Sequence, residues 1–550
     1  MIKAHPGQGQ VRCLLVRPPF HEGTFYNPRE MFRLLGGASA APPLGLLITA
    51  AYLPKHWNLK FVDGDLDPIT DQHLKWADVL MMSCKGSQIG PVRKLIGRAN
   101  DHGVATVAGG AGPTLQSKDY EGLADYVVAG ESEPLIDKLV ADIEAGVSEG
   151  TYRTPEVADT SNAPLPRYDL VELDRYMFVG MSYTRGCPFA CEFCAQIEIF
   201  GRKPRSRSAE DILAEHQLLF DLGFRGMIDL GYDNLIGDIP KTEEVLEKML
   251  VWNREHGYPF CYSTEATMNL ARQPRLLELM RDNDFRYIFM GIESGDEDAL
   301  KQTKKGQNLA MAPEEAVRIV NSYGIIVNTG LILGFDAEKP DAPEKMLDMV
   351  KRTGVFPTLV LPLHALPNTG LSARLEKEGR LFKGGVVNKS ERTDTATTGL
   401  NFVTARPRVE VLEDLCHVLE ELYRPEVHYE RTKLITRQLQ TKYKHQPPKE
   451  KLLQYGLAFA KIARIMNVDR ETRKLFWKSL ARAAITNPAA VAPLIGQAVM
   501  NDSYSKLSQS YVAALRKEIA AVEAVGEDAF NQTMLGNPEP LLRKPTETRA

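Results

Sequence analysis

Three cysteines lie close together in the sequence, Cys187, Cys191 and Cys194, at spacings of four and three residues. Thiolates held in one short loop can bind a metal ion or an iron–sulfur cluster. A four-iron cluster takes one thiolate on each iron, and this loop supplies three. Unless a distant cysteine completes the set, the fourth iron keeps an open position that an external amine and carboxylate can chelate. The loop therefore predicts a redox cofactor site.

The alternatives are a zinc site and three unrelated core cysteines. A structural zinc ion needs a fourth ligand, commonly a histidine or a second cysteine pair nearby. The nearest candidates are His216 and Cys261, and neither stands at the usual spacing. We therefore favour the cluster.

The composition indicates a globular protein of several domains and argues against some classes of function. A chain of 550 residues is long enough for roughly three domains, and its 43% apolar and 25% charged residues are ordinary globular values. The net charge of −4 shows no basic bias, so we expect no nucleic-acid partner. Seven cysteines, three of them in one loop, do not form a disulfide framework and favour a reducing compartment.

No secretory signal opens the chain, because residues 1–10 are short, polar and glycine-containing. The most apolar late stretch, residues 488–500, is too short to cross a bilayer and is broken by Pro493. We expect a cytoplasmic protein with no transmembrane segment.

Residues 11–150 alternate continuous apolar runs with helical patterns, which is typical of a parallel sheet covered on both faces. This pattern predicts a doubly wound α/β domain of the flavodoxin-like or Rossmann-like type. Ligands of such sheets bind at the carboxyl ends of the strands, where glycines let a backbone approach a bulky ligand. For any single loop, a tight turn is the more common reason for glycine, so the set of loops is more informative than each loop alone. The candidate binding residues at these ends are Asp63, Ser83, Gly109, Gly110, Gly130 and Glu131.

Residues 151–175 have the composition of a linker, and six strand-like runs then alternate with helices over residues 176–385. Repeated βα units predict a partial (β/α)6 barrel of the TIM type, with functional groups at the carboxyl ends of its strands. The cysteine loop follows the first of these runs. Glu265, Glu293, Ser294, Gly330 and Gly334 lie at the ends of later runs, although carboxylates there could also be solvated loop residues.

The basic run at residues 202–207 leads into a helix that Ser208 is expected to cap, and we interpret it as a solvated segment. Residues 386–535 are mostly helical by pattern, and residues 536–550 look disordered. The stretch 473–482 is basic and amphipathic. It is expected to pack on the barrel or to make a weak membrane-surface contact.

The cysteine loop closely resembles the cluster motif of the radical S-adenosylmethionine (SAM) superfamily, including the aromatic Phe193 before the last cysteine. The resemblance implies a [4Fe-4S] cluster on Cys187, Cys191 and Cys194. The open iron would bind SAM, which is cleaved to a 5′-deoxyadenosyl radical. The implied SAM contacts are Phe193, Glu265, Glu293, Ser294, Gly330 and Gly334.

The preceding domain resembles the cobalamin-binding domain of the cobalamin-dependent branch of that superfamily, through residues 42–46, Gly109-Gly110 and residues 125–133. The six strand-end residues of that domain are the implied cobalamin contacts. An Asp-x-His-x-x-Gly loop is missing, so the resemblance implies cobalamin bound without a protein histidine. Residues 366–371 and 379–381 resemble a further signature of the branch, from which Asn368 and Gly370 depart. We expect a turn here in spite of both changes, since asparagine tolerates left-handed dihedrals. The helical C-terminal region resembles that of a subset that includes hopanoid methylases.

The leading hypothesis is a cobalamin-dependent radical SAM enzyme that methylates an unactivated carbon of a small molecule, with a lipid as one option. One SAM would form methylcobalamin, and a second would supply the radical. The alternatives are a radical enzyme that transfers no methyl group and a non-catalytic binding protein. An electron donor such as flavodoxin or ferredoxin is the implied protein partner.

Overall fold

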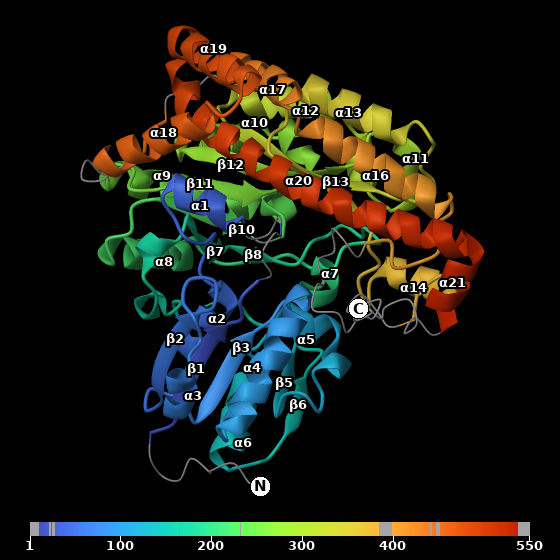
Figure 1. Cartoon of the computed structure of the whole chain (residues 1–550). Coiled ribbons are helices and arrows are strands. Elements are labelled where there is room, and N and C mark those ends of the chain that lie inside the picture. The colour runs from blue at the N-terminus through green and yellow to red at the C-terminus, as the bar shows by residue number, and fades with distance from the viewer. Residues whose placement is uncertain are drawn as a thin grey trace.

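The computed structural model describes residues 10–20, 24, 28–161, 163–231, 233–383, 399–439, 443–446 and 452–536. Most of the expected tail at residues 536–550 lies outside these ranges. In Figure 1 the N-terminal α/β unit lies below a second, central α/β unit, and the C-terminal helices cover the far side of the central unit.

The N-terminal unit is built on a six-stranded parallel sheet in the order β2-β1-β3-β4-β5-β6. Its apolar strands are covered on both faces: α3 and α4 contribute to one hydrophobic cluster, and α2 and α6 to another. The sheet confirms the predicted doubly wound fold. Its strands are β1 (Arg12–Arg17), β2 (Asn58–Asp63), β3 (Val79–Ser83), β4 (Ala105–Gly109), β5 (Tyr126–Ala129) and β6 (Gly150–Arg153). Its helices are α2 (Leu44–Tyr52), α3 (Asp71–Trp76), α4 (Ile89–Asp101), α5 (Ala111–Leu115) and α6 (Ile136–Glu144).

The edge strand β6 was not predicted, because it begins where the sequence takes on the composition of a linker. It pairs in parallel with β5, with Tyr126 opposite Gly150 and Ala129 opposite Arg153. Only Tyr152 of this strand is buried. Backbone pairing along an existing edge therefore defines β6, rather than an apolar run of its own.

The central unit holds a second six-stranded parallel sheet, in the order β14-β13-β12-β11-β10-β7. Neighbours in the chain are neighbours in the sheet, and β7 and β14 are its two open edges, as a partial barrel requires. The strands are β7 (Phe178–Ser182), β10 (Met227–Gly231), β11 (Cys261–Glu265), β12 (Phe285–Glu293), β13 (Ile326–Leu333) and β14 (Thr358–Pro362). The helices are α7 (Gln196–Phe200), α8 (Ala209–Asp221), α9 (Ile239–Glu255), α10 (Pro274–Asp282), α11 (Glu297–Gln302), α12 (Pro313–Ser322), α13 (Ala342–Thr353) and α14 (Gly370–Lys377).

The C-terminal region is helical, as predicted. Its longest helix, α20, runs beside α16 across the central unit, as Figure 1 shows. None of the helices in the described residues combines the length and the apolar character needed to cross a bilayer. The helices are α16 (Arg408–Leu422), α17 (Pro425–Gln438), α18 (Leu452–Ile465), α19 (Arg470–Thr486), α20 (Val491–Val525) and α21 (Glu527–Gly536).

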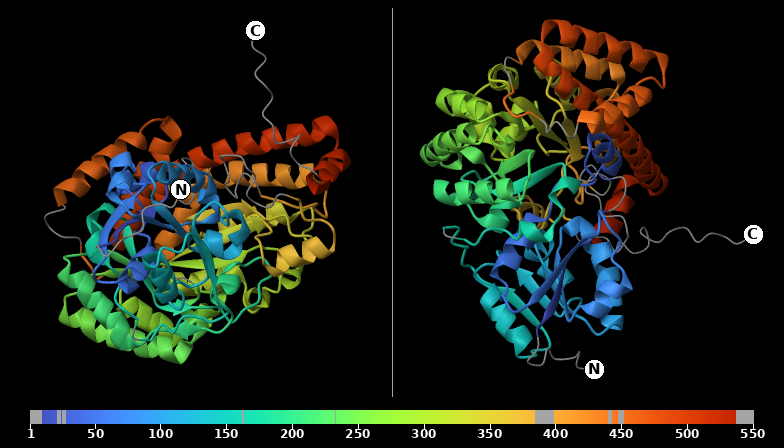
Figure 2. Two further views of the ribbon diagram at one scale, coloured as in Figure 1. Left: turned by 90° about the horizontal axis from the view of Figure 1, so that it is seen from below. Right: turned by 90° about the vertical axis from the view of Figure 1, so that its left-hand side faces the viewer.

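One N-terminal segment leaves its own sheet and joins the C-terminal helices. The helix α1 (Arg29–Leu35) places Met31 and Phe32 in one hydrophobic cluster with Ile462 and Phe476. In Figure 1 and the right-hand view of Figure 2, this blue helix lies among the orange and red ones. The two ends of the chain therefore share a core.

A buried ion pair within the N-terminal sheet also binds a tyrosine at the start of the barrel. Asp63 accepts hydrogen bonds from Arg17 Nε at 2.8 Å and Nη2 at 2.5 Å, and from the Tyr176 hydroxyl at 2.8 Å. Removing one partner of a buried pair leaves the other charge unpaired, which is costly. Asp63 therefore has a structural role at this junction.

Replacing Asp63 with alanine should lower the free energy of unfolding by about 3 kcal/mol, because Arg17 would stay buried with only the Asp65 carboxylate, 3.5 Å away, and the Tyr176 hydroxyl would lose its acceptor. Asp78→Ala is the matched control: it breaks the exposed Arg12–Asp78 pair, in which 45% of the Arg12 side chain is exposed, and should cost less than about 1 kcal/mol. Urea unfolding followed by tryptophan fluorescence measures both. Equal shifts in midpoint for the two variants would contradict this assignment.

Candidate functional site

A short antiparallel ribbon closes the cysteine loop. Its strands are β8 (Thr184–Arg185) and β9 (Arg205–Ser206), which pair on either side of residues 186–204. Gly186 follows β8 with a φ of 88°, and a Cβ atom there would lie 2.5 Å from the Lys203 carbonyl oxygen, so this position needs glycine. Within the loop, the Cys187 N–H donates to the Gly201 carbonyl at 3.2 Å. The loop is thus held by its own backbone.

The three cysteines are free thiols, with Cys191 buried and the other two half-buried. Burial raises the pKa of Cys187, and it raises that of Cys194 to about 11. Metal binding therefore has to displace their protons. In the described part of the chain, no three His, Cys, Asp or Glu side chains converge as a single metal ion requires. The arrangement is thus unlike a zinc site, whereas a four-iron cluster binds each thiolate to a separate iron.

Neither alternative zinc ligand is available. His216 is buried and contacts the Ile212 carbonyl at 2.7 Å and the Tyr262 hydroxyl at 3.1 Å. Burial lowers its pKa to about 4. Cys261 is buried at the start of β11, where burial raises its pKa to about 11.

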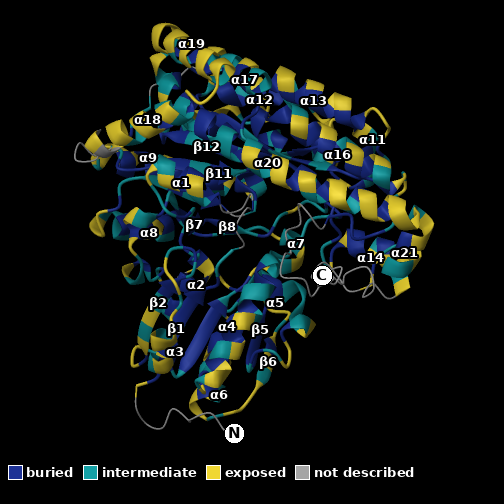
Figure 3. Ribbon diagram, in the orientation of Figure 1, coloured by how far each residue is buried: buried dark blue, intermediate teal, exposed yellow. Residues whose placement is uncertain are grey.

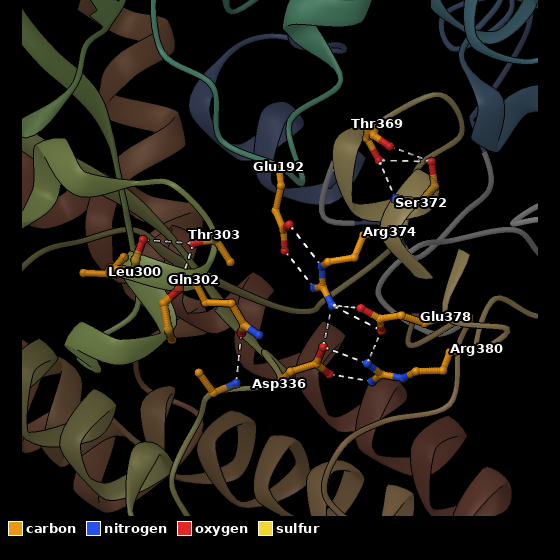
Figure 4. Close-up of polar contacts among 12 residues, drawn as sticks. Glu192, Leu300, Gln302, Thr303, Asp336, Thr369, Ser372, Arg374, Glu378 and Arg380 are labelled. Atoms are coloured by element: carbon orange, nitrogen blue, oxygen red, sulfur yellow. Dashed lines mark hydrogen bonds and ion pairs between the residues drawn. The ribbon is translucent and has the colours of Figure 1, made fainter. Parts of the chain in front are cut away.

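Glu192, between the second cysteine and Phe193, is held from three directions, and Figure 4 shows its carboxylate pointing toward Arg374. Its N–H donates to the Thr303 carbonyl at 3.1 Å, and its own carbonyl accepts from the Leu371 N–H at 2.7 Å. Its carboxylate binds Arg374 through Nη2 at 2.8 Å and Nε at 3.2 Å. Arg374 also contacts Asp336 at 2.9 Å. Glu192 and Arg374 were not predicted, because 182 residues separate them in the chain.

The turn before α14 keeps the conformation that the sequence allowed. Asn368 has a φ of 64°, in the left-handed region that asparagine tolerates. Its side-chain amide donates to the Leu115 carbonyl of the N-terminal unit at 2.8 Å. This loop therefore contacts both the cysteine loop and the N-terminal unit.

A buried lysine lies next to the cysteine loop and was not predicted. The Lys305 ammonium forms an ion pair with Glu293 and lies 5.7 Å from the centre of the Phe193 ring. Burial lowers the pKa of Lys305, but the Glu293 carboxylate and the Cys191 thiol group outweigh it, and the net pKa is raised. A Cβ atom on Gly291 would lie 2.2 Å from a Glu293 carboxylate oxygen, so glycine makes room for this pair.

The remaining strand-end residues divide into two groups. Gly330 faces the same space as Glu293, since a Cβ atom there would lie 3.1 Å from Phe289 and 4.0 Å from the Glu293 carboxylate. Ser294 is buried and accepts a hydrogen bond from the Asp296 N–H at 3.1 Å. Gly334 has a φ of 106°, and a Cβ atom there would lie 2.6 Å from Leu400. The structure thus brings Phe193, Glu293 and Gly330 together, whereas Ser294 and Gly334 meet other parts of the protein.

An acidic group lies at the carboxyl ends of β10 and β11. Burial raises the pKa of Glu265 to about 8, with the neighbouring Asp229 and Asp233 adding to the shift and Lys85 opposing it. Burial likewise raises the pKa of Asp233 to about 6. Asp229 accepts a hydrogen bond from the Ser263 hydroxyl at 2.5 Å. Because Lys85 belongs to the N-terminal unit, these charges meet between the two units.

A cavity of about 360 Å³ lies at the carboxyl ends of the N-terminal sheet. Five of the six predicted cobalamin residues line it: Ser83, Gly109, Gly110, Gly130 and Glu131. Cβ atoms on Gly45 and Gly130 would meet no atom within 4 Å, so both face open space. Asp63 is outside the lining, because Arg17 and Tyr176 bind its carboxylate. Its assignment to cobalamin is corrected accordingly.

The cysteine loop forms part of the wall of this cavity. Arg185, Gln196 and Phe200 line it, although none was predicted to do so. Arg185 binds Glu131 at 2.6 Å and Glu133 at 2.7 Å. The cavity and the cysteine loop are therefore adjacent, with charged side chains joining them.

The basic run at residues 202–207 is not a uniformly solvated segment. Arg205 binds Glu131 at 3.0 Å, and Arg207 is buried in an ion pair with Glu215. Ion pairs with glutamates thus account for two of its arginines. Ser208 caps α8 as predicted, by accepting from the Asp211 N–H at 3.1 Å.

No histidine among the described residues lines the cavity. His73 instead caps α3, where its Nδ1 accepts from the Thr70 N–H at 3.2 Å. Glycines at the walls of this cavity let the backbone approach a bulky ligand such as a corrinoid closely. The residues present therefore fit cobalamin.

Three comparisons with known proteins agree with this architecture. Family models match at residues 37–140 (B12 binding domain), 181–350 (Radical SAM superfamily) and 369–517 (a domain of unknown function, DUF4070). An uncharacterized methyltransferase of Synechocystis sp. is 33% identical, over 92% of this chain and 93% of that protein. The hopanoid C-2 methylase of Rhodopseudomonas palustris is 34% identical, over 69% of this chain and 73% of that protein. The cobalamin-dependent SAM radical enzyme OxsB has the same fold, with a TM-score of 0.57, 14% identity, and coverage of 96% of this chain and 83% of OxsB.

The chain belongs to the family of cobalamin-binding radical SAM enzymes. The three cofactors predicted from the sequence, an iron–sulfur cluster, SAM and cobalamin, are those of this family. The assignment makes the protein an enzyme, and the non-catalytic alternative is set aside.

Glu265→Gln should change how stability depends on pH. The unfolded chain releases the Glu265 proton near pH 4.5, whereas the folded chain keeps it to about pH 8. The folded state binds more protons in between, so the wild-type protein loses stability as pH rises through this window. Glutamine does not titrate, so the stability of the variant relative to wild type should rise by about 3 kcal/mol between pH 5.5 and 8. Urea unfolding at both pH values measures this. If the free energy of unfolding changes with pH in the same way for wild type and Glu265→Gln, the prediction is wrong. The exposed control Glu297→Gln is expected to follow wild type in this way.

Arg374→Leu should loosen the cysteine loop and raise the rate at which a chelator removes reconstituted iron by about tenfold, as is typical when a residue that orients metal ligands is lost. Arg380→Leu is the matched control, because Arg380 shares Asp336 and Glu378 with Arg374 but does not contact Glu192. Iron release is followed by the absorbance of the chelate. If both variants lose iron equally fast, the Glu192 contact is not what holds the loop.

Proposed function

We propose that this protein transfers a methyl group from SAM to an unactivated carbon of a small molecule, by way of a 5′-deoxyadenosyl radical. The observation that carries the proposal is the shared wall between the cysteine loop and the glycine-lined cavity, formed by Arg185, Gln196 and Phe200. A site that holds both cofactors side by side suits a reaction that needs a radical and a methyl donor at one carbon. Two of the relatives described above bear the names of a methyltransferase and a methylase, which supports methyl transfer.

In this proposal Cys187, Cys191 and Cys194 hold the cluster. Phe193, Glu265, Glu293, Ser294, Gly330 and Gly334 form the proposed SAM region. Lys305 joins that region as a buried cation that offsets the Glu293 carboxylate. Ser83, Gly109, Gly110, Gly130 and Glu131 form the cobalamin region, now without Asp63.

When bound, the cluster supplies the electron for SAM cleavage and cobalamin supplies the methyl donor. The residues of the chain position these groups and exclude water. Glu192, held by Arg374, fixes the loop between its second and third cysteines. The carboxyl of Glu265, whose pKa lies near 8, keeps its proton at neutral pH and can donate a hydrogen bond in the space between the units.

A lipid is the substrate class that we propose. Half-buried apolar side chains occupy one face of the strands next to the cluster region, and Phe289, Ile332, Leu359 and Leu361 belong to this set. The similarity to a hopanoid C-2 methylase supports the same class. We also propose a flavodoxin or ferredoxin as the electron donor. The proposed boundaries between tail, cobalamin domain, linker, barrel, helical extension and C-terminal tail lie at residues 10, 150, 175, 385 and 535.

The test is a product assay on reconstituted protein loaded with cobalamin, under anaerobic conditions, with a strong reductant and a bacterial lipid extract. We expect both 5′-deoxyadenosine and S-adenosylhomocysteine to rise when the extract is added. Cys191→Ala should abolish 5′-deoxyadenosine, because the loop would lose a cluster thiolate. Mass spectrometry measures both products.

The control is Cys416→Ala, which removes a buried thiol of α16 outside the loop and should keep the activity. Formation of 5′-deoxyadenosine without S-adenosylhomocysteine would favour a radical reaction without methyl transfer. Activity of the Cys191→Ala variant would refute the cluster assignment.

A further inference from the structure

The helices α18 and α19 and the turn between them expose large apolar side chains. Six of the twelve exposed large apolar residues in the described chain lie in this hairpin: Leu453, Tyr455, Leu457, Val468, Trp477 and Ile485. Val468 and Ile485 are each 83% exposed, and Leu453 is 76% exposed. Single exposed apolar residues are ordinary, but a group of this size on one element points to a partner.

The exposed side chains lie on the outward faces of the two helices. Ile462, Met466, Phe476 and Ala483 are buried against Met31 of α1 and Tyr429 of α17 and fix the inward faces. Trp477 packs edge-on against Phe459 at 6.3 Å, which holds the two helices side by side. In Figures 1 and 3 the hairpin lies at the edge of the molecule, and much of its surface is exposed.

The same surface is strongly basic. It carries seven lysines and arginines between residues 461 and 482 and only two acidic residues, in a chain whose net charge is −4. All seven basic side chains are exposed: Lys461, Arg464, Arg470, Arg473, Lys474, Lys478 and Arg482. Among the described residues, none of the seven forms an ion pair within 4.0 Å. Their charge is therefore free to meet an external anion.

Basic and apolar side chains are interleaved on these faces. On α19, Lys474 and Lys478 flank Trp477, and Arg482 precedes Ile485. On α18, Leu453 and Leu457 are four residues apart, and Lys461 and Arg464 continue the same stripe. Nucleic acid would use the charges but offers nothing to the aliphatic side chains. An anionic lipid surface uses both, because acyl chains accept the apolar groups while headgroup phosphates pair with the cations.

We propose that this hairpin surface, formed by the outward faces of α18 and α19 and the turn at Val468, docks the enzyme on an anionic lipid bilayer. The contact is peripheral, with Leu453, Leu457, Val468 and Ile485 entering the headgroup region. It would bring a lipid substrate within reach, but it is independent of the proposed methyl transfer and can hold even if that reaction is wrong.

The test is flotation of the full-length, cluster-loaded protein with vesicles of phosphatidylcholine alone or of phosphatidylcholine and phosphatidylglycerol at a ratio of three to one. We expect binding to the anionic vesicles, weakened by salt because charge contributes. Leu453→Ser/Leu457→Ser should lower the bound fraction by about tenfold, as expected when apolar insertion is lost. Lys474→Gln/Lys478→Gln should lower it on anionic vesicles by a similar factor.

The matched control is Leu222→Ser/Val251→Ser, which removes two exposed apolar residues from the α8 and α9 region, 43% and 55% exposed, and should bind like wild type. Cluster absorbance and circular dichroism verify that each variant is folded. The proposal is overturned if wild type does not bind anionic vesicles, or if the hairpin variants bind as well as the control. It is also overturned if light scattering shows a dimer of wild type that the hairpin variants lose while their vesicle binding is unchanged. The last would identify the hairpin surface as a contact between two copies of the chain.

Discussion

The arrangement of the site depends on one buried group of ion pairs, Glu131 with Arg185 and Arg205. Glu131 follows the fifth strand of the N-terminal sheet, whereas the two arginines stand on β8 and β9, the strands that close the cysteine loop. Taking charges out of water is costly, and the cost is offset only while each charge keeps its partner. A shift of the loop away from the sheet would leave buried charge unpaired. The pairs therefore fix the cavity of one unit against the cysteine loop of the other.

The cysteine loop adds a second layer of constraint from the opposite side. Glu192 is held by Arg374 of α14 and by backbone contacts to Thr303 and Leu371. The loop is therefore fixed between the barrel and the segment that follows β14. Asn368 of that segment also reaches the N-terminal unit. Small displacements of ligands matter in a site of this kind, because electron transfer and radical chemistry need fixed distances. The structure supplies rigidity through contacts that are distant in sequence.

The charges around the site are separated by location. The carboxyl group of Glu265 lies between the units and holds its proton to about pH 8, because burial and two neighbouring carboxylates disfavour its charge. Lys305 is buried on the other side, beside Phe193, and its partner Glu293 keeps its ammonium charged. The Glu265 carboxyl is thus neutral because it keeps a proton, and the Glu293 carboxylate is balanced by the Lys305 ammonium. Burial of these two groups therefore leaves little uncompensated charge at either place.

The sequence by itself determined what depends on local pattern. The spacing of the cysteines indicated the cluster loop, and continuous apolar runs predicted both parallel sheets, because buried strands need apolar side chains on both faces. The Ser208 cap and the left-handed turn at Asn368 also followed from local chemistry. Five of the six strand-end residues predicted for cobalamin line one cavity, since the carboxyl ends of parallel strands meet at one edge.

Only the tertiary structure decided which polar side chains pair. Asp63 looked like a ligand contact at a strand end, yet Arg17 and Tyr176 bind it. Arg205 and Arg207 looked solvated, yet Arg205 is half-buried and Arg207 is buried, and each pairs with a glutamate. Lys305, Glu192, the edge strand β6 and the docking of α1 on the C-terminal helices gave no local signal. Each depends on groups that are far apart in the chain and close only after folding. Periodicity and spacing describe a segment and its neighbours, whereas the desolvation of a charge depends on everything that surrounds it.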